Sequence, residues 1–157
     1  MGQRIRLLAV GKLKEPFFRK AADHYAAKIA AMSRFDLAEI KDASKIRDPA
    51  DRARAEGASL LGRLAAKDTL LLLDERGEEF TSREWAALLQ KLFEDPAGDP
   101  CFVLGGPFGV GPEARAKAAR VISLGRMTMP HELARVALLE QIYRALTILA
   151  GSPYHHD

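Results

Sequence analysis

The chain alternates short apolar runs with longer segments of helical pattern, and this alternation limits the folds available to it. The apolar runs are Ile5–Val10, Phe35–Ile40, Leu70–Leu73, Cys101–Leu104 and Val121–Leu124. Most are continuously apolar, which is typical of strands covered on both faces. The alternation predicts an α/β fold, a mostly parallel sheet of five to six strands with helices on both faces.

Helices are expected between these runs, at Pro16–Ala31, Pro49–Ala66, Ser82–Phe93, Pro112–Ala119 and His131–Ala150. Proline suits the first turn of a helix, Thr81 and Glu84 have the spacing of a capping box, and Gly151 suits a helix C-terminus. The chain has 157 residues, with no internal repeat and no long linker. Residues 1–157 are therefore expected to form a single domain.

Composition excludes several classes of protein. The single Cys101 excludes an internal disulfide and a cysteine-rich metal site, and its apolar surroundings predict a buried, inert thiol. No apolar run is long enough to span a membrane, and the N-terminus lacks the pattern of a signal peptide, so a cytoplasmic protein is expected. The net charge is +3, and basic residues are in excess near the N-terminus. This excess is either a surface that attracts phosphates or a solvated face. It includes Arg4, Arg6, Lys12, Lys14, Arg19 and Lys20.

The last predicted helix is apolar around most of its circumference. Besides one apolar stripe it carries Leu138, Leu139, Ala145 and Ile148. Such a helix is either buried within the monomer or also packs on another subunit, and the small size of the chain favours the second interpretation.

Ligands of parallel sheets bind at the carboxyl ends of strands, and three such ends stand out. They are Leu72–Asp74, the glycine-rich segment Leu104–Gly111 and the segment Leu124–Met129. The glycine-rich segment has neither the spacing of a Walker A loop nor that of a dinucleotide fingerprint, so it is either a phosphate-approaching loop or a plain turn. The acidic pairs Asp74-Glu75 and Glu78-Glu79 are expected in a solvated turn.

Four residues near the C-terminus are candidates for chemistry. His131 and Arg135 are four residues apart on the last helix, which places them on one helix face as a charged pocket wall or as surface residues. Tyr154 and His155 suit base stacking and proton handling, unless the terminus is frayed. His155 and His156 have no spaced carboxylate or cysteine beside them, so no metal site is expected.

Three blocks of sequence together resemble a known family. They are LGGPFGVG, LGRMTMPHELARVALLEQIYRA and PYHHD, and Val10-Gly11-Lys12 and Leu73-Asp74 also fit. The chain resembles the ribosomal RNA large subunit methyltransferase H family over essentially its whole length. The resemblance rests on the long helical block and the terminal Pro-Tyr-His, since the glycine loop alone is unspecific.

The resemblance implies a SPOUT methyltransferase fold with a C-terminal trefoil knot, which general topology rules would not predict. It implies S-adenosyl-L-methionine as cofactor and methylation of N3 of a pseudouridine in 23S ribosomal RNA. The partners implied are the assembled ribosome and a second copy of the chain. The cofactor-binding positions implied are Leu73, Gly105, Gly106, Leu124, Gly125, Arg126, Met127, Thr128 and Met129.

The tail departs from the family pattern at two positions. Ser152 stands where relatives often have His, and His156 stands where a permanent cation is common. Because a histidine is only partly charged near neutral pH, phosphate contacts made by the tail are expected to be weaker.

The chemistry suggests roles for the four candidates. The N3 proton of the base must leave before or during attack, so a cation or donor near the ring oxygens would stabilise the developing anion. Arg135 or His131 is the candidate for that role, and Tyr154 with His155 is the candidate for base positioning or proton removal. The tail is expected to reach the cofactor pocket of a neighbouring subunit, with the last helix as the dimer face.

Two alternatives remain open from the residues alone. One is a non-catalytic nucleotide- or RNA-binding α/β module of flavodoxin-like type, which needs the glycine loop but not the tail. The other is a SPOUT methyltransferase with a different RNA target, because the target atom depends on the shape of the pocket.

Overall fold

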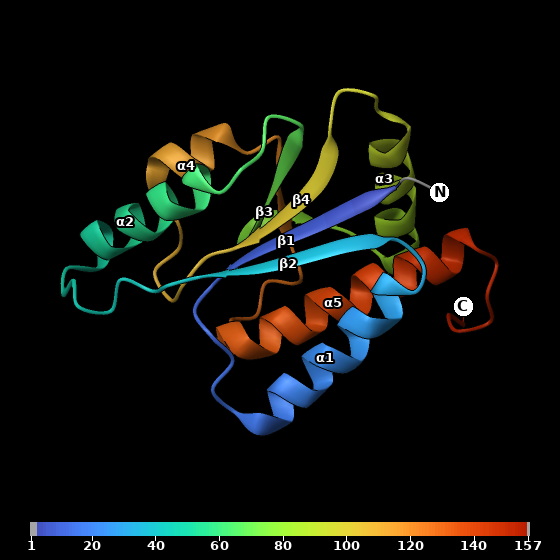
Figure 1. Ribbon diagram of the computed structural model, residues 1–157, viewed down its shortest axis with the longest axis horizontal. Coiled ribbons are helices and arrows are strands. Elements are labelled where there is room, and N and C mark those ends of the chain that lie inside the picture. The colour runs from blue at the N-terminus through green and yellow to red at the C-terminus, as the bar shows by residue number, and fades with distance from the viewer. Residues whose placement is uncertain (1–2, 157) are drawn as a thin grey trace.

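Five strands form one wholly parallel sheet in the computed structural model, which describes residues 3–156 (Figure 1). The strand order is β2-β1-β4-β3-β5. The strands are β1 (Arg4–Val10), β2 (Arg34–Ile40), β3 (Asp68–Glu79), β4 (Asp99–Leu104) and β5 (Arg120–Ser123). The parallel α/β fold predicted from the alternation is confirmed, with five strands.

The helices cover both faces of this sheet. They are α1 (Pro16–Ala30), α2 (Pro49–Gly62), α3 (Ser82–Glu94), α4 (Gly111–Lys117) and α5 (His131–Leu149). Helices α1, α3 and α5 pack on one face, and α2 with α4 on the other (Figure 1). None of the helices within residues 3–156 is long and apolar enough to cross a membrane.

Successive residues of the central strands face opposite layers, which explains their continuous apolar character. In β1, Leu7 belongs to the core under α1, α3 and α5, whereas Leu8 belongs to the core under α2 and α4. In β4, Phe102 and Val103 divide in the same way. The predicted burial of Cys101 is confirmed, because its side chain is fully enclosed beside α2 and α4.

The helix boundaries follow the expected local signals, and two predicted C-terminal ends lie more than one residue too late. The capping box is present, since Thr81 accepts from the Glu84 N–H and Glu84 accepts from the Thr81 N–H. Helix α2 ends at Gly62 instead of residue 66. Helix α4 ends at Lys117, because the Ala119 N–H already donates to the Leu70 carbonyl and leads the chain into β5.

Strand β3 differs most from its prediction. It runs to Glu79 and not only to Leu73, and its register against β5 shifts between Leu73 and Glu78. The prediction of a solvated turn at Asp74-Glu75 and Glu78-Glu79 was wrong, because these residues belong to β3. Residues 74–77 bulge out of the ladder, and the bulge aims polar side chains at the carboxyl edge of the sheet.

Candidate functional site

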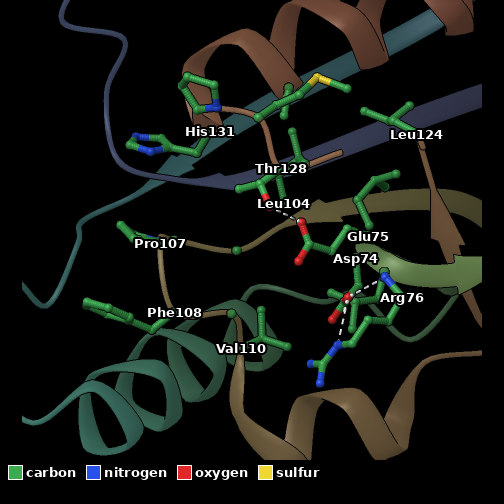
Figure 2. A pocket seen from close by; sticks show the side chains of 18 of the residues that line it. Asp74, Glu75, Arg76, Leu104, Pro107, Phe108, Val110, Leu124, Thr128 and His131 are labelled. Carbon is green, nitrogen blue, oxygen red and sulfur yellow. Dashed lines mark hydrogen bonds and ion pairs between the residues drawn. The ribbon is translucent and has the colours of Figure 1, made fainter. Parts of the chain in front are cut away.

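A cavity of about 810 Å³ lies at the carboxyl edge of the sheet, beside the bulge of β3 and the ends of β4 and β5 (Figure 2). Its wall comes from residues 72–76 within β3, residues 104–110 from the end of β4 onward, and residues 124–131 from the end of β5 to the start of α5. The three strand ends singled out in the sequence therefore meet at one place. A volume of this size is within the range of pockets that hold small molecules and cofactors.

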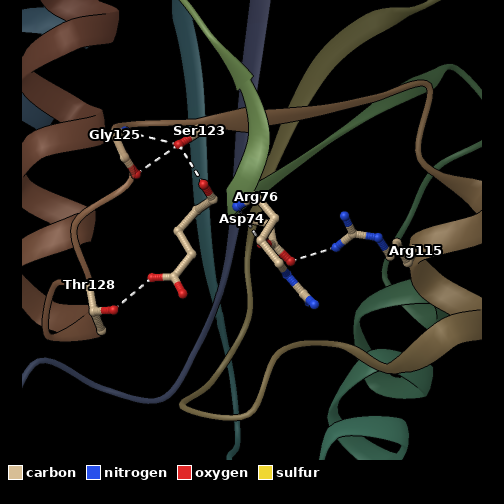
Figure 3. A network of polar contacts seen from close by, with 7 residues as sticks. Asp74, Arg76, Arg115, Ser123, Gly125 and Thr128 are labelled. Atoms are coloured by element: carbon tan, nitrogen blue, oxygen red, sulfur yellow. Dashed lines mark hydrogen bonds and ion pairs between the residues drawn. The ribbon is translucent and has the colours of Figure 1, made fainter.

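The bulge of β3 lines the cavity with charged groups. The Asp74 carboxylate accepts from the Arg76 N–H at 2.9 Å and from the Arg115 guanidinium at 2.5 Å, which ties α4 to the bulge (Figure 3). Burial alone would raise the pKa of Asp74, but the hydrogen bonds from Arg76 and Arg115 outweigh it and lower that pKa. Asp74 therefore stays ionised, and its charge is balanced by two arginines.

The segment after β5 is fastened to the same bulge. Ser123 is buried, and its hydroxyl lies 3.1 Å from the Glu75 carbonyl and accepts from the Gly125 N–H at 2.9 Å (Figure 3). The Thr128 hydroxyl donates to the Glu75 carboxylate at 2.9 Å (Figure 2). Gly125 has φ +141°, a backbone conformation that favours glycine. These contacts fix one wall of the cavity against the other.

The glycine-rich segment forms a tight loop between β4 and α4. Gly106 and Gly109 pair across it, and the Gly109 N–H donates to the Gly106 carbonyl at 3.1 Å. Gly109 and Gly111 have φ near +80°, which explains their residue type. Phe108 sits at the tip and is half exposed, so the loop presents backbone and one aromatic ring to the cavity (Figure 2).

The first turn of α5 closes the remaining side. His131 is exposed and lines the cavity, as Figure 2 shows. The next residue, Glu132, accepts the N–H groups of Lys14 and Glu15, and these hydrogen bonds lower its pKa. The start of α5 is thereby clamped to the loop that follows β1.

Arg135 is placed differently from His131. Its side chain is 3% exposed and forms an ion pair with Glu39 at 2.5 Å. It also donates to the Gly11 carbonyl at 2.7 Å and is not part of the cavity wall. The arginine therefore joins α5 to the ends of β1 and β2 and does not form a free pocket wall.

The tail folds onto the other end of α5. The Tyr154 hydroxyl donates to Glu140 at 2.9 Å, and Arg144 contacts Glu140 at 2.6 Å and the His155 Nδ1 at 3.0 Å. The Arg144 guanidinium also lies over the Tyr154 ring, 4.8 Å from its centroid. Burial, and secondly the bond to Glu140, raise the pKa of Tyr154, so its phenol keeps its proton.

The structure brings most of the predicted cofactor residues together and leaves some predicted site residues apart. The cavity wall contains Leu73, Gly105, Gly106, Leu124, Gly125, Met127, Thr128, Met129 and His131. Arg126 is not among them, since its side chain is 88% exposed and pairs with Glu79. Arg135, Tyr154 and His155 also lie outside this wall.

Sequence reasoning missed two parts of the wall. Glu75 was assigned to a solvated turn and Arg76 was not singled out, whereas Phe108 lay within the glycine-rich segment but was given no role. Their signal was the position after a buried strand, which is where parallel sheets place ligand-binding groups.

The basic residues near the N-terminus fall into two groups in the folded structure. Arg4 and Arg6 form ion pairs with Asp36 and Asp68, and Arg19 donates to the Leu13 carbonyl. Lys12 and Lys14 are exposed on the loop after β1, at the same edge of the sheet as the cavity.

Comparison with known proteins identifies the family. The family model described as "Predicted SPOUT methyltransferase" matches residues 3–155. The protein named ribosomal RNA large subunit methyltransferase H from Maridesulfovibrio salexigens is 48% identical over 98% of each chain. The protein of that name from Gloeobacter violaceus is 45% identical and covers 98% of this chain and 99% of its own. The chain belongs to this family. The resemblance drawn from the three sequence blocks is confirmed.

A solved structure supports the fold of this family member. A probable methyltransferase from Bordetella pertussis Tohama I superposes with a TM-score of 0.57, covering 92% of this chain and 95% of its own. The two sequences are 19% identical, so the likeness concerns the fold alone.

Proposed function

We propose that this chain is an S-adenosyl-L-methionine-dependent methyltransferase that acts on N3 of a pseudouridine in 23S ribosomal RNA within assembled ribosomes. The observation that carries the proposal is the cavity in which three strand ends meet, in a chain of the ribosomal RNA large subunit methyltransferase H family. SPOUT methyltransferases generally use this cofactor.

The residues of the cavity fit such a cofactor. Leu104, Leu124 and Met129 supply apolar surface for a flat heterocycle, and backbone groups of the glycine loop and of residues 124–129 can recognise its edge. The Glu75 carboxylate suits a cationic ligand, because its bonded partner Thr128 is neutral. Once bound, the cofactor supplies a methyl group on a positively charged sulfur.

The geometry assigns different roles to the four candidate residues. His131 lines the cavity and takes the role of donor to the ring oxygens of the target base. Arg135 acts as a positioning residue, because its guanidinium is buried against Glu39 and Gly11. The raised pKa of Tyr154 argues against proton removal by its phenol, so we assign the ring to positioning of the base.

His155 has a defined orientation in the tail. Arginine has only donors, so Nδ1 of His155 accepts from Arg144, and a neutral ring then carries its proton on Nε2. The contact with Arg144 thereby fixes the orientation of the imidazole.

The tail and the cavity lie at opposite ends of α5. The helix has 19 residues, a length of roughly 28 Å at 1.5 Å per residue. Figure 1 shows the segment that follows α5, residues 150–156, at the end of this helix remote from the cavity edge. Two copies with antiparallel α5 helices would bring each tail to the cavity of its partner.

The exposed surface of α5 supports this arrangement. A groove of about 580 Å³ runs beside the helix, with an apolar lining that includes Trp85, Leu133 and Val136. Leu133, an apolar residue of α5 that lines this groove, is 39% exposed. We therefore propose a homodimer through α5, with cavities completed by the partner's tail.

Two measurements test the proposal. Titration calorimetry should give binding of S-adenosyl-L-methionine to the purified chain. Ribosomes from a strain lacking the native enzyme should gain one methyl group, which mass mapping should locate on a pseudouridine of 23S ribosomal RNA. Methylation at another nucleotide would favour a different RNA target, and absence of specific heat would favour a non-catalytic binding module.

A further inference from the structure

Helix α2 supports the glycine-rich loop, residues 105–111, from beneath. A Cβ atom built on Gly57 would lie 1.7 Å from the Val110 carbonyl oxygen, so only glycine allows this approach. A Cβ atom on Gly111 would lie 3.1 Å from Arg54 on the same helix. Figure 2 shows Phe108, at the loop tip, lying over the teal helix α2. The position of the loop is thus set by contacts with α2.

Between these contacts lies a buried carboxylate, Glu56, whose side chain is 0% exposed. Its Oε2 atom accepts from the Ala43 N–H at 2.9 Å and from the Arg52 Nε at 3.1 Å. Its Oε1 atom receives no hydrogen bond from any residue between 3 and 156. The two oxygens of one carboxylate therefore have very different surroundings.

The unpaired oxygen faces the loop of the cavity. A Cβ atom on Gly106 would lie 2.4 Å from Oε1, so this oxygen points at the Cα of Gly106. A Cα–H group is a weak donor, whereas a buried carboxylate oxygen gains much more from an N–H group. Gly106 is followed closely by Gly109 and preceded by Gly105, and glycine allows the peptide groups of the loop to rotate with little strain.

We propose that Glu56 is a positioning residue for the glycine loop: its Oε1 accepts the backbone N–H of Gly105, Gly106, Phe108 or Gly109 when the cofactor fills the cavity. This inference rests on the function proposed above. The hydrogen bond would hold the loop in the conformation that binds the cofactor. Arg52 links Glu56 to the loop tip, because its guanidinium donates to Glu56 and also lies 5.5 Å from the centroid of the Phe108 ring.

The substitution Glu56→Gln tests this role, because it changes one oxygen without changing the shape of the side chain. The remaining amide oxygen can still accept from Ala43 and Arg52, and the amide nitrogen then faces Gly106. A nitrogen donor cannot accept the loop N–H, so cofactor affinity measured by calorimetry should fall about tenfold, the loss expected for one hydrogen bond to a charged group. The exposed Glu94→Gln, at the end of α3, is the matched control and should bind like wild type.

Hydrogen exchange supplies a second readout that a purely structural role would not change. In the wild type, cofactor should slow exchange of an amide among residues 105–109, and in Glu56→Gln this protection should be lost while core strand amides remain unchanged. Equal or tighter binding by Glu56→Gln would overturn the proposal, because it would mean that cofactor binding does not depend on Oε1 as an acceptor. If the cofactor slowed exchange of none of these amides in the wild type, the proposal would also be overturned, and no variant would be needed to show it. Wild-type protein that binds no cofactor would instead refute the proposed function.

Discussion

At the residue scale, Arg135 shows what helical spacing can and cannot predict. The four-residue interval from His131 was correctly interpreted as helical, but spacing does not identify the groups that pack against a helix face. Glu39, the partner of Arg135, is 96 residues away in the sequence. Such a pair depends on how the strands and helices are arranged, and no local pattern in the sequence encodes it.

The buried position of Arg135 predicts a stability effect. Arg135→Ala leaves the Gly11 carbonyl and Glu39 without their donor, and we expect the free energy of unfolding to fall by about 2–4 kcal/mol. Urea denaturation measures this loss. Glu39→Gln should cost less, because the Glu39 side chain is 34% exposed. An Arg135→Ala protein of wild-type stability that had lost methyl transfer would instead support a catalytic role.

Cys101 predicts a specific response to alkaline pH. Burial raises the pKa of its thiol from 9.0 to about 12, so the unfolded chain loses this proton at a lower pH than the folded chain. Its contribution to stability is complete below pH 9 and is lost as pH rises from about 9 to 12. By pH 10 the loss should be about 1–2 kcal/mol, and Cys101→Ala should show a correspondingly flatter dependence in urea denaturation. Parallel curves for the two proteins would contradict the assigned burial.

At the element scale, the bulge of β3 is the part of the site that local sequence patterns do not predict. The apolar run stops at Leu73, so the polar residues after it were expected in a turn. The chain nevertheless pairs with β5 again at Glu78 and Glu79. Pairing with a partner strand overrides local polarity, and it places Asp74 and Glu75 in the cavity wall. The strands and helix caps were predictable because their signals are local.

Gly77 is the residue that permits this bulge. A Cβ atom there would lie 2.6 Å from the backbone of Val121, so Gly77→Ala should force β3 and β5 apart and cost about 1–3 kcal/mol. Weaker cofactor binding should accompany the loss of stability measured by urea denaturation. Gly62→Ala is the matched control, because nothing lies within 4 Å of its Cβ position. Equal stability of the two variants would show that the bulge does not depend on glycine.

At the scale of the whole molecule, the sequence predicted the sheet but not its connectivity. The strand order β2-β1-β4-β3-β5 requires contacts between segments far apart in the chain, which periodicity does not encode. The trefoil knot stays a prediction from the family, because strand order and register do not by themselves define how a chain is threaded.

The proposed dimer predicts complementation between two inactive variants. One variant carries Gly106→Arg, which would fill the cavity, and the other carries Tyr154→Ala together with His155→Ala, which would disable the tail. Each should be inactive alone. After subunit exchange, a mixed dimer has one cavity and one tail that are both intact, so methylation of ribosomes should reappear.

The recovered activity should follow the fraction of mixed dimers, which native mass spectrometry can count. As the control, each variant is taken through the same exchange procedure by itself. Mixtures that stay inactive although mixed dimers form would show that each tail serves its own chain.

The position of α5 in the chain has a consequence for biosynthesis. This helix covers one face of the sheet between α1 and α3, yet it follows all five strands in the chain. While the chain is being made, Leu7, Leu71 and Phe102 have no cover from the helix that later buries them. Completion of this core must therefore wait until α5 itself has been made and has left the ribosome that made it.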